Sequence, residues 1–393
     1  MLACVGVGLP AYSPADAPAS ESAGAQSDAI ATPSDAIATP SGKDEAALRA
    51  RLDNAWSAFE AGDLEAARDR VDGVASGAFS AIPELADECA ALGAMIALRM
   101  GDAQTAFNAL ADRPESSRVT RRFRELEAEA LATLGRTDAA TALLEALVGE
   151  RASAGAALRL ATLRFEIGEH RAALRALEIA LEIAPGDYYA EVLRARCRLE
   201  LGETAAAIRE LRALLARADT PEAHYLLGRA LEQEQDLAGA RRELVRVLDA
   251  EPDYLEAVFA LARVARASGE IDDARRLFER YRVLQRADWE RLRRGTALEQ
   301  ECARRPRDVT IWLEAARFRL ETGDPDAAIA AAWHALALDP RADPARLVLA
   351  RALRAQGRFA EAALHLQKLL RADPTHADAD RELRELIERH AKG

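Results

Sequence analysis

The sequence is poor in several kinds of residue, and each deficit argues against a class of protein. Only 5% of the 393 residues are aromatic, and the four cysteines, Cys4, Cys89, Cys197 and Cys302, form no C-x-x-C pair. We therefore expect neither a disulfide framework nor a zinc site, and interpret the last three cysteines as small apolar side chains on helices. The net charge of −12 argues against a nucleic-acid-binding protein, which usually carries a basic excess.

Motifs for catalysis and cofactor binding are also missing. The sequence contains no P-loop, no H-E-x-x-H and no G-x-S-x-G, and no glycine-rich loop follows a strand pattern. Histidines such as His224, His334 and His365 occur singly. The abundant carboxylates have arginine four residues away, which is typical of ion pairs on solvated helix faces. We predict that the chain is not an enzyme and has no catalytic residues, no cofactor and no metal site.

The sequence has no run of about 18 apolar residues, so no transmembrane segment is predicted. Residues 1–9, MLACVGVGL, are apolar without basic residues and resemble the tail of a signal peptide. Leu2-Ala3-Cys4 also resembles the end of a lipoprotein lipobox, which would make Cys4 a lipid anchor, although only three residues precede it. A chance apolar start is the alternative. The sequence thus favours the periplasm or envelope slightly over the cytoplasm.

Residues 10–43 are rich in Pro, Ala, Ser and Asp and contain SDAIATP twice, at 27–33 and 34–40. Such a segment buries too little apolar surface to order itself. We interpret residues 1–43 as a signal remnant followed by a disordered tether. A tolerated low-complexity expansion explains the duplication equally well.

From residue 44 onward the sequence is rich in helix formers and repeats itself. Residues that end one helix and start a turn recur every 33 or 34 positions, at Gly101, Gly135, Gly168, Gly202, Gln235 and Gly269, and again at Gly323 and Gly357. In the period 153–187, Gly168 ends the first helix because glycine adopts the left-handed cap without strain, and Pro185 ends the second. Each pair of short amphipathic helices exposes an apolar face that only a neighbouring pair can cover.

These residues resemble the tetratricopeptide repeat family. The family pattern is matched, for example, by Trp312, Ala316, Gly323, Ala328, Ala335 and Pro340, and by Leu227, Gly228, Ala240, Leu244 and Pro252. The resemblance implies an all-α fold, a right-handed superhelical solenoid of antiparallel helix pairs. We place about nine repeats, starting near 48, 87, 121, 154, 188, 221, 255, 309 and 343. In this pattern Gly228 occupies the small-residue slot between the two helices of a repeat, and we expect Gly228→Ala to be tolerated because other repeats have alanine there.

Two segments depart from the period. Residues 287–305 are extra to it and end before Pro306, so we predict an extra helix or hinge at 287–306 that separates an N-terminal array, 44–286, from a C-terminal array, 307–393. The last segment, HADADRELRELIERHAKG, is charged apart from a narrow stripe. Because a terminal repeat needs a polar outer face, we predict a C-terminal capping helix. Its stripe consists of Ala379, Leu383, Leu386 and Ile387.

The resemblance also implies a binding surface, because the first helix of each repeat lines the concave side of such arrays. Family positions that face this groove hold five arginines, Arg196, Arg229, Arg263, Arg317 and Arg351, together with Tyr225, Phe259, Arg266 and Arg354. An extended peptide with acidic and apolar side chains would suit this surface. The alternative is that nearby glutamates on the same helices, such as Glu200 beside Arg196 and Glu321 beside Arg317, neutralise the arginines locally.

The sequence therefore favours a non-catalytic scaffold or adaptor, of bacterial type, that binds partner proteins or peptides in its groove, with envelope assembly or secretion as its setting. The alternative is a regulatory subunit that recruits or gates a glycosyltransferase or a polysaccharide synthase or export machine. The sequence itself does not name the partner.

Overall fold

A computed structural model describes residues 42–75, 82–118 and 120–390, and within these ranges every regular element is a helix. The predicted signal remnant, the tether and the lipid anchor at Cys4 lie outside the described residues, except that the first helix already begins at Gly42. The first half of the chain forms α1 (Gly42–Glu60), α2 (Leu64–Ala75), α3 (Pro83–Arg99), α4 (Ala103–Ala111), α5 (Glu115–Arg118), α6 (Arg121–Thr133), α7 (Thr137–Glu150), α8 (Ala154–Glu166), α9 (His170–Ile183) and α10 (Tyr188–Glu200). The second half forms α11 (Thr204–Leu215), α12 (Pro221–Gln233), α13 (Leu237–Ala250), α14 (Leu255–Ala267), α15 (Ile271–Arg304), α16 (Val309–Glu321), α17 (Pro325–Leu338), α18 (Asp343–Ala355), α19 (Phe359–Ala372) and α20 (Ala377–His390).

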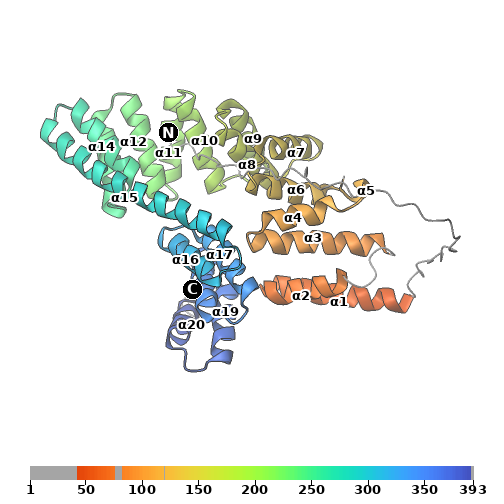
Figure 1. Ribbon diagram of the computed structural model, residues 1–393. Coiled ribbons are helices and arrows are strands. Elements are labelled where there is room, and N and C mark those ends of the chain that lie inside the picture. Colours follow the sequence, from red (N-terminus) through yellow and green to blue (C-terminus); the bar gives the residue numbers. More distant parts are fainter. Residues whose placement is uncertain (1–41, 76–81, 119, 391–393) are drawn as a thin grey trace, which may run out of the picture.

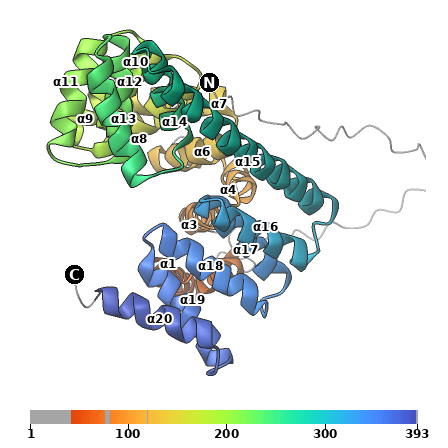
Figure 2. The same cartoon turned by 90° about the vertical axis from the view of Figure 1, so that its left-hand side faces the viewer.

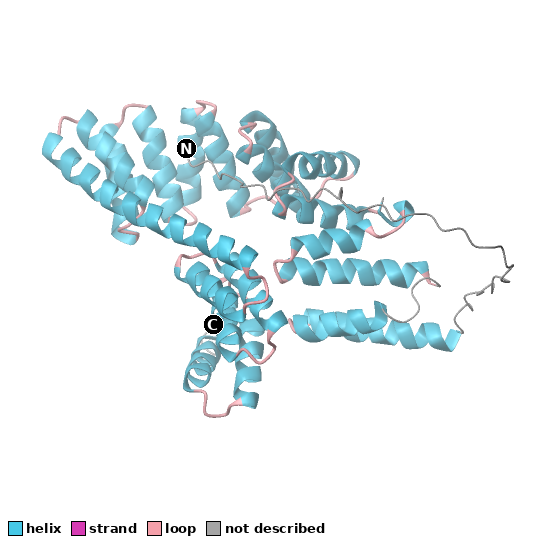
Figure 3. Ribbon diagram, viewed as in Figure 1, coloured by secondary structure: helices cyan, strands magenta, loops and turns pink. Residues whose placement is uncertain are grey.

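Consecutive helices pack as pairs, such as α8 with α9, α12 with α13 and α16 with α17, and the pairs follow one another in a curved array (Figure 1). The first helices of the pairs begin at residues 42, 83, 121, 154, 188, 221, 255, 309 and 343, close to the predicted starts. The all-α solenoid is confirmed, and Figure 3 shows helices joined by short loops throughout the described ranges. The hand of the superhelix and the number of repeats remain predictions.

The turns within the pairs have the backbone conformation that the period predicts. At Gly202, for example, φ is +77°. The amide of Gly202 donates to the carbonyl of Leu199, and the next amide donates to Arg198, which satisfies two carbonyls at the helix end. Gln235 takes the same place with φ of +64°, a left-handed conformation that costs a side-chain-bearing residue about 1 kcal/mol.

Gly228 is more tightly packed than the sequence suggested. A Cβ atom built on Gly228 would lie 2.8 Å from Cγ of Leu244, whose side chain is fully buried. The expectation that Gly228→Ala is tolerated is therefore wrong, because the contact is with a branched carbon inside the core and not with the free end of a flexible chain. Glycine at this position lets α12 and α13 approach more closely than alanine would.

Helix α15 corrects the prediction of a separate helix at 287–306. Residues 271–304 form one continuous helix, so the extra segment lengthens the second helix of its pair. Most side chains between 282 and 297 are exposed. Figures 1 and 2 show α15 running from the α14 end of the array toward α16. Whether this segment acts as a hinge remains a prediction.

The two ends of the chain meet. In Figures 1 and 2 the first helices lie beside the helices that follow α15. One hydrophobic cluster contains side chains from both ends, among them Leu52, Leu92 and Ile96 together with Trp333, Leu349 and Leu366. The predicted division into arrays at 44–286 and 307–393 thus has a shared core across it. We call this contact between α1–α4 and α17–α19 the junction.

Two turn glycines have a second role at the junction. A Cβ atom on Gly62 would lie 2.3 Å from Cγ of Glu361, and one on Gly101 would lie 2.4 Å from Cβ of Ala330. Both glycines also have φ near +80°. These turns therefore require glycine twice, once for the backbone and once for the close approach of α19 and α17.

Candidate functional site

Three of the predicted groove arginines follow one another on one face of the array. Arg196, Arg229 and Arg263 lie on α10, α12 and α14, which contact one another directly. Their side chains are 43%, 32% and 48% exposed. We call the surface formed by the first helices of the pairs the first-helix face, and these three residues the arginine row.

Each arginine of the row lies over an aromatic ring. The guanidinium carbon of Arg196 is 4.8 Å from the ring centre of Phe165, and the corresponding distances are 6.0 Å for Arg229 over Tyr225 and 5.9 Å for Arg263 over Phe259. An arginine over an aromatic face gains about 0.5–1 kcal/mol at an exposed site. The stacking therefore helps to hold the guanidinium groups in place.

Each arginine of the row also has a glutamate partner on a neighbouring first helix. Arg229 pairs with Glu200 of α10 at 3.3 Å, and Arg263 pairs with Glu232 of α12 at 2.8 Å. Arg196 approaches a glutamate of α12 at 4.0 Å. The sequence suggested that glutamates would neutralise arginines on the same helix; the pairs here run between helices instead. Half-exposed pairs of this kind stabilise by only about 0–1 kcal/mol, so a competing carboxylate can replace the glutamate.

Two predicted groove arginines lack such partners. Arg266 and Arg317 are exposed, and neither has an ion pair within the part of the chain that the structure describes. Arg266 lies on α14, one turn from Arg263, with its guanidinium 5.6 Å from the ring centre of Phe278. Arg317 lies on α16, beyond the long helix. These two cations are free to meet an acidic group from outside.

The last two predicted groove arginines face the chain's own C-terminal helix. Arg351 donates to Glu382 of α20 at 2.7 Å, and Arg354 lies 3.7 Å from the same carboxylate. Glu382 is buried. Within α20, Ala379 and Leu386 are buried as predicted, whereas Ile387 is 58% exposed. Arg351 and Arg354 therefore hold the capping helix, and their predicted role in partner binding has no support in this geometry.

Aromatic side chains add an apolar surface beside the arginine row. Phe259 is 37% exposed, and its ring lies 4.9 Å from that of Tyr281 on α15. Tyr225 packs at 5.2 Å against Tyr254, and burial raises the pKa of the Tyr225 hydroxyl. Tyr225 is thus largely inside the structure and stays neutral, whereas Phe259 offers ring surface to a partner.

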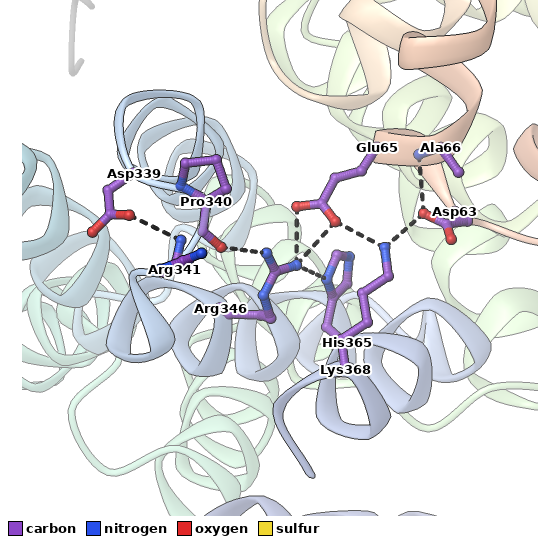
Figure 4. Close-up of polar contacts among 9 residues, drawn as sticks. All are labelled: Asp63, Glu65, Ala66, Asp339, Pro340, Arg341, Arg346, His365 and Lys368. Atoms are coloured by element: carbon purple, nitrogen blue, oxygen red, sulfur yellow. Dashed lines mark hydrogen bonds and ion pairs between the residues drawn. The ribbon is translucent and has the colours of Figure 1, made fainter. Parts of the chain in front are cut away.

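A cluster of charged side chains at the junction was not predicted. Arg346 donates from Nη1 to both carboxylate oxygens of Glu65 at 2.9 and 3.0 Å and from Nη2 to the carbonyl of Pro340 at 2.9 Å. Lys368 donates to Glu65 at 2.8 Å and to Asp63 at 2.7 Å. Figure 4 shows these groups together, with α2 on one side and α18 and α19 on the other. The ion pairs link positions about 280 to 305 residues apart in the chain.

His365 lies inside this charged cluster. Its ring is 1% exposed, its Nδ1 lies 3.4 Å from Nη1 of Arg346, and its Nε2 has no hydrogen-bond partner. Burial lowers the pKa of His365 to about 4, and Lys368 and Arg346 act in the same direction, whereas Glu65 opposes them. The imidazole is therefore neutral at physiological pH.

The carboxylates of the cluster are stabilised in their charged form. Burial alone would raise the pKa of Glu65, but the hydrogen bond from Lys368 and the charges of Arg346 and Lys368 hold it below its ordinary value. The pKa of Asp63 is lowered in the same way, against its own burial, by Lys368 and the amide of Ala66. One signal in the sequence could have pointed here, because Lys368 is the only lysine between residues 43 and 392.

Chemistry beyond binding finds no obvious centre in the described ranges. Within them, no three His, Cys, Asp or Glu side chains are grouped so that they could hold a metal ion. Cys89, Cys197 and Cys302 are buried free thiols, and burial raises the pKa of the first two to about 11. None of the described helices is long and apolar enough to cross a membrane.

Comparison with known proteins places these features in context. A sequence model described as tetratricopeptide repeat matches residues 164–230, 231–298 and 319–386, together just over half of the chain. No curated protein matches the sequence.

Solved structures with the same kind of fold share little sequence with the chain. MamA residues 41 to the end, from Desulfovibrio magneticus RS-1, is 17% identical over 42% of this chain and 96% of that one, with a TM-score of 0.40. A tetratricopeptide repeat protein from Parabacteroides merdae is 18% identical over 68% and 98%, with a TM-score of 0.38. The C-terminal part of a repeat protein from Cytophaga hutchinsonii is 17% identical over 65% and 98%, with a TM-score of 0.41.

Proposed function

This chain belongs to the tetratricopeptide repeat family, and we propose that it is a scaffold that binds an extended segment of a partner protein on its first-helix face. Repeat arrays of this family are protein-interaction modules, typically without catalysis, and their stacked helices form extended binding surfaces. The finer proposal concerns the place on that surface and the chemistry of the segment.

One observation supports the place, namely the exposed ring of Phe259 between a paired and an unpaired arginine. Arg263 is held by its glutamate, whereas Arg266 has no ion pair in the described part of the chain. Binding sites usually combine an apolar or aromatic anchor with a few oriented polar groups. The surface of α14 offers both within two helical turns.

The same groups define the partner segment. An apolar side chain would pack on Phe259, and a carboxylate would pair with Arg266, since arginine binds carboxylates through two parallel hydrogen bonds. A second acidic group, further along the segment, would reach Arg317. Because the contacts are half exposed, the interaction should weaken as salt is raised.

A photo-crosslinking amino acid at position 259 tests the place directly, and position 245 is its matched control. Phe259 is 37% exposed and Val245 is 38% exposed, but Val245 lies on α13, the second helix of its pair. In the native host we expect a discrete crosslinked protein from position 259 and none from position 245. Equal adducts at both positions, or none at either, would contradict the proposal.

Charge reversal then tests the role of Arg266. We expect Arg266→Glu to reduce the crosslink at 259 by roughly tenfold, because it replaces attraction for a carboxylate by repulsion. The control is Arg242→Glu on α13, which is also exposed and without an ion pair in the described ranges. A crosslink that Arg266→Glu leaves unchanged would show that the partner segment is not acidic.

The setting is a further part of the proposal. The notion of envelope assembly or secretion rests on the resemblance of residues 1–9 to a signal remnant, and the alternative is a regulatory subunit of a glycosyltransferase or polysaccharide synthase. Mass spectrometry of the protein crosslinked at position 259 separates these two roles. An envelope or secretion component supports the first, and a polymerising enzyme supports the second.

A further inference from the structure

A cavity of about 490 Å³ lies beside the junction, away from the first-helix face of α10–α14. One wall comes from α2, α3 and α4, and the other comes from α17. The two walls are more than 200 residues apart in the chain, so they face each other only because the ends of the array meet. The volume falls in the range of sites for small organic molecules.

Most of the lining is apolar. Cys89, Ile96 and Met100 of α3 face Ala330 and Trp333 of α17, and several alanines complete the surface. No side chain fills the space, although cores of folded proteins are normally packed as closely as organic crystals. A cavity of this size and composition is therefore suited to an apolar guest.

The charged side chains in the lining offer no net charge. They are two arginines and two aspartates. Arg113 is paired with Asp87 at 2.7 Å, and Asp102 accepts hydrogen bonds from the amide and hydroxyl of Thr105 at the start of α4. A charged guest would thus gain little here, whereas a neutral guest loses nothing by leaving water.

One buried polar group in the lining is unsatisfied. The indole of Trp333 is 4% exposed, and its Nε1–H has no hydrogen-bond partner. Buried donors are almost always paired, and each one left unpaired costs about 1–3 kcal/mol. An acceptor supplied by a guest would remove that cost.

We propose that this cavity is a binding site for a neutral, largely apolar small molecule with at least one hydrogen-bond acceptor, which Trp333 binds through its indole N–H. The guest contacts α3 and α17 at once, so it binds the closed junction and stabilises it. Binding free energy is then added to closure, because the open array lacks one wall of the site. The site is separate from the proposed partner surface, and either proposal can fail without the other.

Nile red tests the site, because it is neutral, planar and apolar and carries a carbonyl acceptor. The full chain is titrated with the dye, and the fluorescence that rises in apolar surroundings is followed. We expect saturable binding of one dye per chain. Absence of saturable binding overturns the proposal.

Gly93→Leu fills the cavity from α3. A Cβ atom at Gly93 would meet only Cγ1 of Val71, at an ordinary 3.7 Å, and leucine favours the helix more than glycine does. The matched control is Gly149→Leu in α7, another helical glycine, with nothing within 4 Å of its Cβ position. We expect Gly93→Leu to weaken dye binding at least tenfold and Gly149→Leu to leave it unchanged. Equal binding by the wild type and Gly93→Leu overturns the proposal.

Trp333→Phe tests the hydrogen bond separately and also decides the matter if Gly93→Leu alters the circular dichroism spectrum. Phenylalanine keeps an aromatic ring in the wall but has no N–H. We expect the dye to bind roughly 2- to 10-fold more weakly, as one neutral hydrogen bond predicts. Unchanged affinity for Trp333→Phe refutes the role of the indole.

Discussion

Glu65→Gln is the sharpest perturbation of the junction, because it changes one atom and removes one charge. The carboxylate accepts two hydrogen bonds from Arg346 and one from Lys368. After the substitution Asp63 still binds Lys368, but the guanidinium of Arg346 loses its only ion pair in the described part of the chain. The side chain of Arg346 is 9% exposed, so water replaces the carboxylate poorly.

The magnitude follows from the burial of the partners. Removing one member of a fully buried ion pair costs about 3–5 kcal/mol, whereas exposed pairs contribute about 0–1 kcal/mol. The side chain of Glu65 is 22% exposed and that of Lys368 is 23% exposed, which places this cluster between the two cases. We expect Glu65→Gln to weaken the junction by about 2 kcal/mol, the middle of that range.

Hydrogen exchange measures this loss, because α1 and α2 have neighbours on two sides, α3 and the junction. When the junction weakens by about 2 kcal/mol, amides of α2 that exchange by local opening should exchange roughly 30-fold faster. Small-angle scattering should show a larger radius of gyration in the same sample. The control is Glu60→Gln, since Glu60 is exposed and has no ion pair in the described ranges.

The result that would refute the reasoning is exchange in α2 that Glu65→Gln and Glu60→Gln accelerate equally, by less than about threefold. A double-mutant cycle with Arg346→Leu adds an independent check. The coupling energy between the two positions should be about 2 kcal/mol, because the two residues are in direct contact. Coupling near zero would mean that the ends of the array are held by apolar packing alone.

Three further predictions concern single positions. Gly228→Ala should lower the unfolding free energy of the array by about 1 kcal/mol, because overpacking against Leu244 outweighs the gain in helix propensity; an increase in urea stability would contradict the packing argument. Gln235→Gly should raise it by about 1 kcal/mol by removing left-handed strain, whereas Gly202→Gln should lower it, and equal urea midpoints for the two would count against this. His365 binds a proton in the unfolded state below its ordinary pKa of 6.5 but in the folded state only below about 4, so stability should fall by roughly 3 kcal/mol as pH drops from 6.5 to 4; His365→Gln should flatten that part of the pH profile of thermal unfolding.

The repeating part of this fold could be predicted because its signals are local. Gly168 is left-handed and ends α8, and Gln235 adopts the same conformation where the period requires a glycine. Each signal acts within one turn of helix, so the helix pairs could be placed from the sequence to within a few residues. The packing around Gly228 was misjudged because it depends on how closely two helices approach, which no local pattern specifies.

The binding face was predictable in composition but not in pairing. Family positions led correctly to a row of first-helix arginines, but Glu200 could reach Arg196 on its own helix or Arg229 on the next one. The structure selects Arg229, because the distance between neighbouring helices decides and the sequence does not contain it. Arg351 appeared equivalent to the row until α20 was placed against it.

The junction could not be predicted because it depends on geometry summed along the whole array, and α15 makes the largest single contribution to that sum. A helix of 34 residues is about 50 Å long at 1.5 Å per residue. Its middle is exposed and makes few contacts, so its rigidity comes from its own hydrogen bonds and from pairs such as Arg291 with Asp288. A flexible linker of equal length would leave the distance between its ends variable, and closing the array would then cost conformational entropy. A rigid helix fixes that distance, so the ion pairs at Glu65 and the cavity beside Trp333 form without that cost.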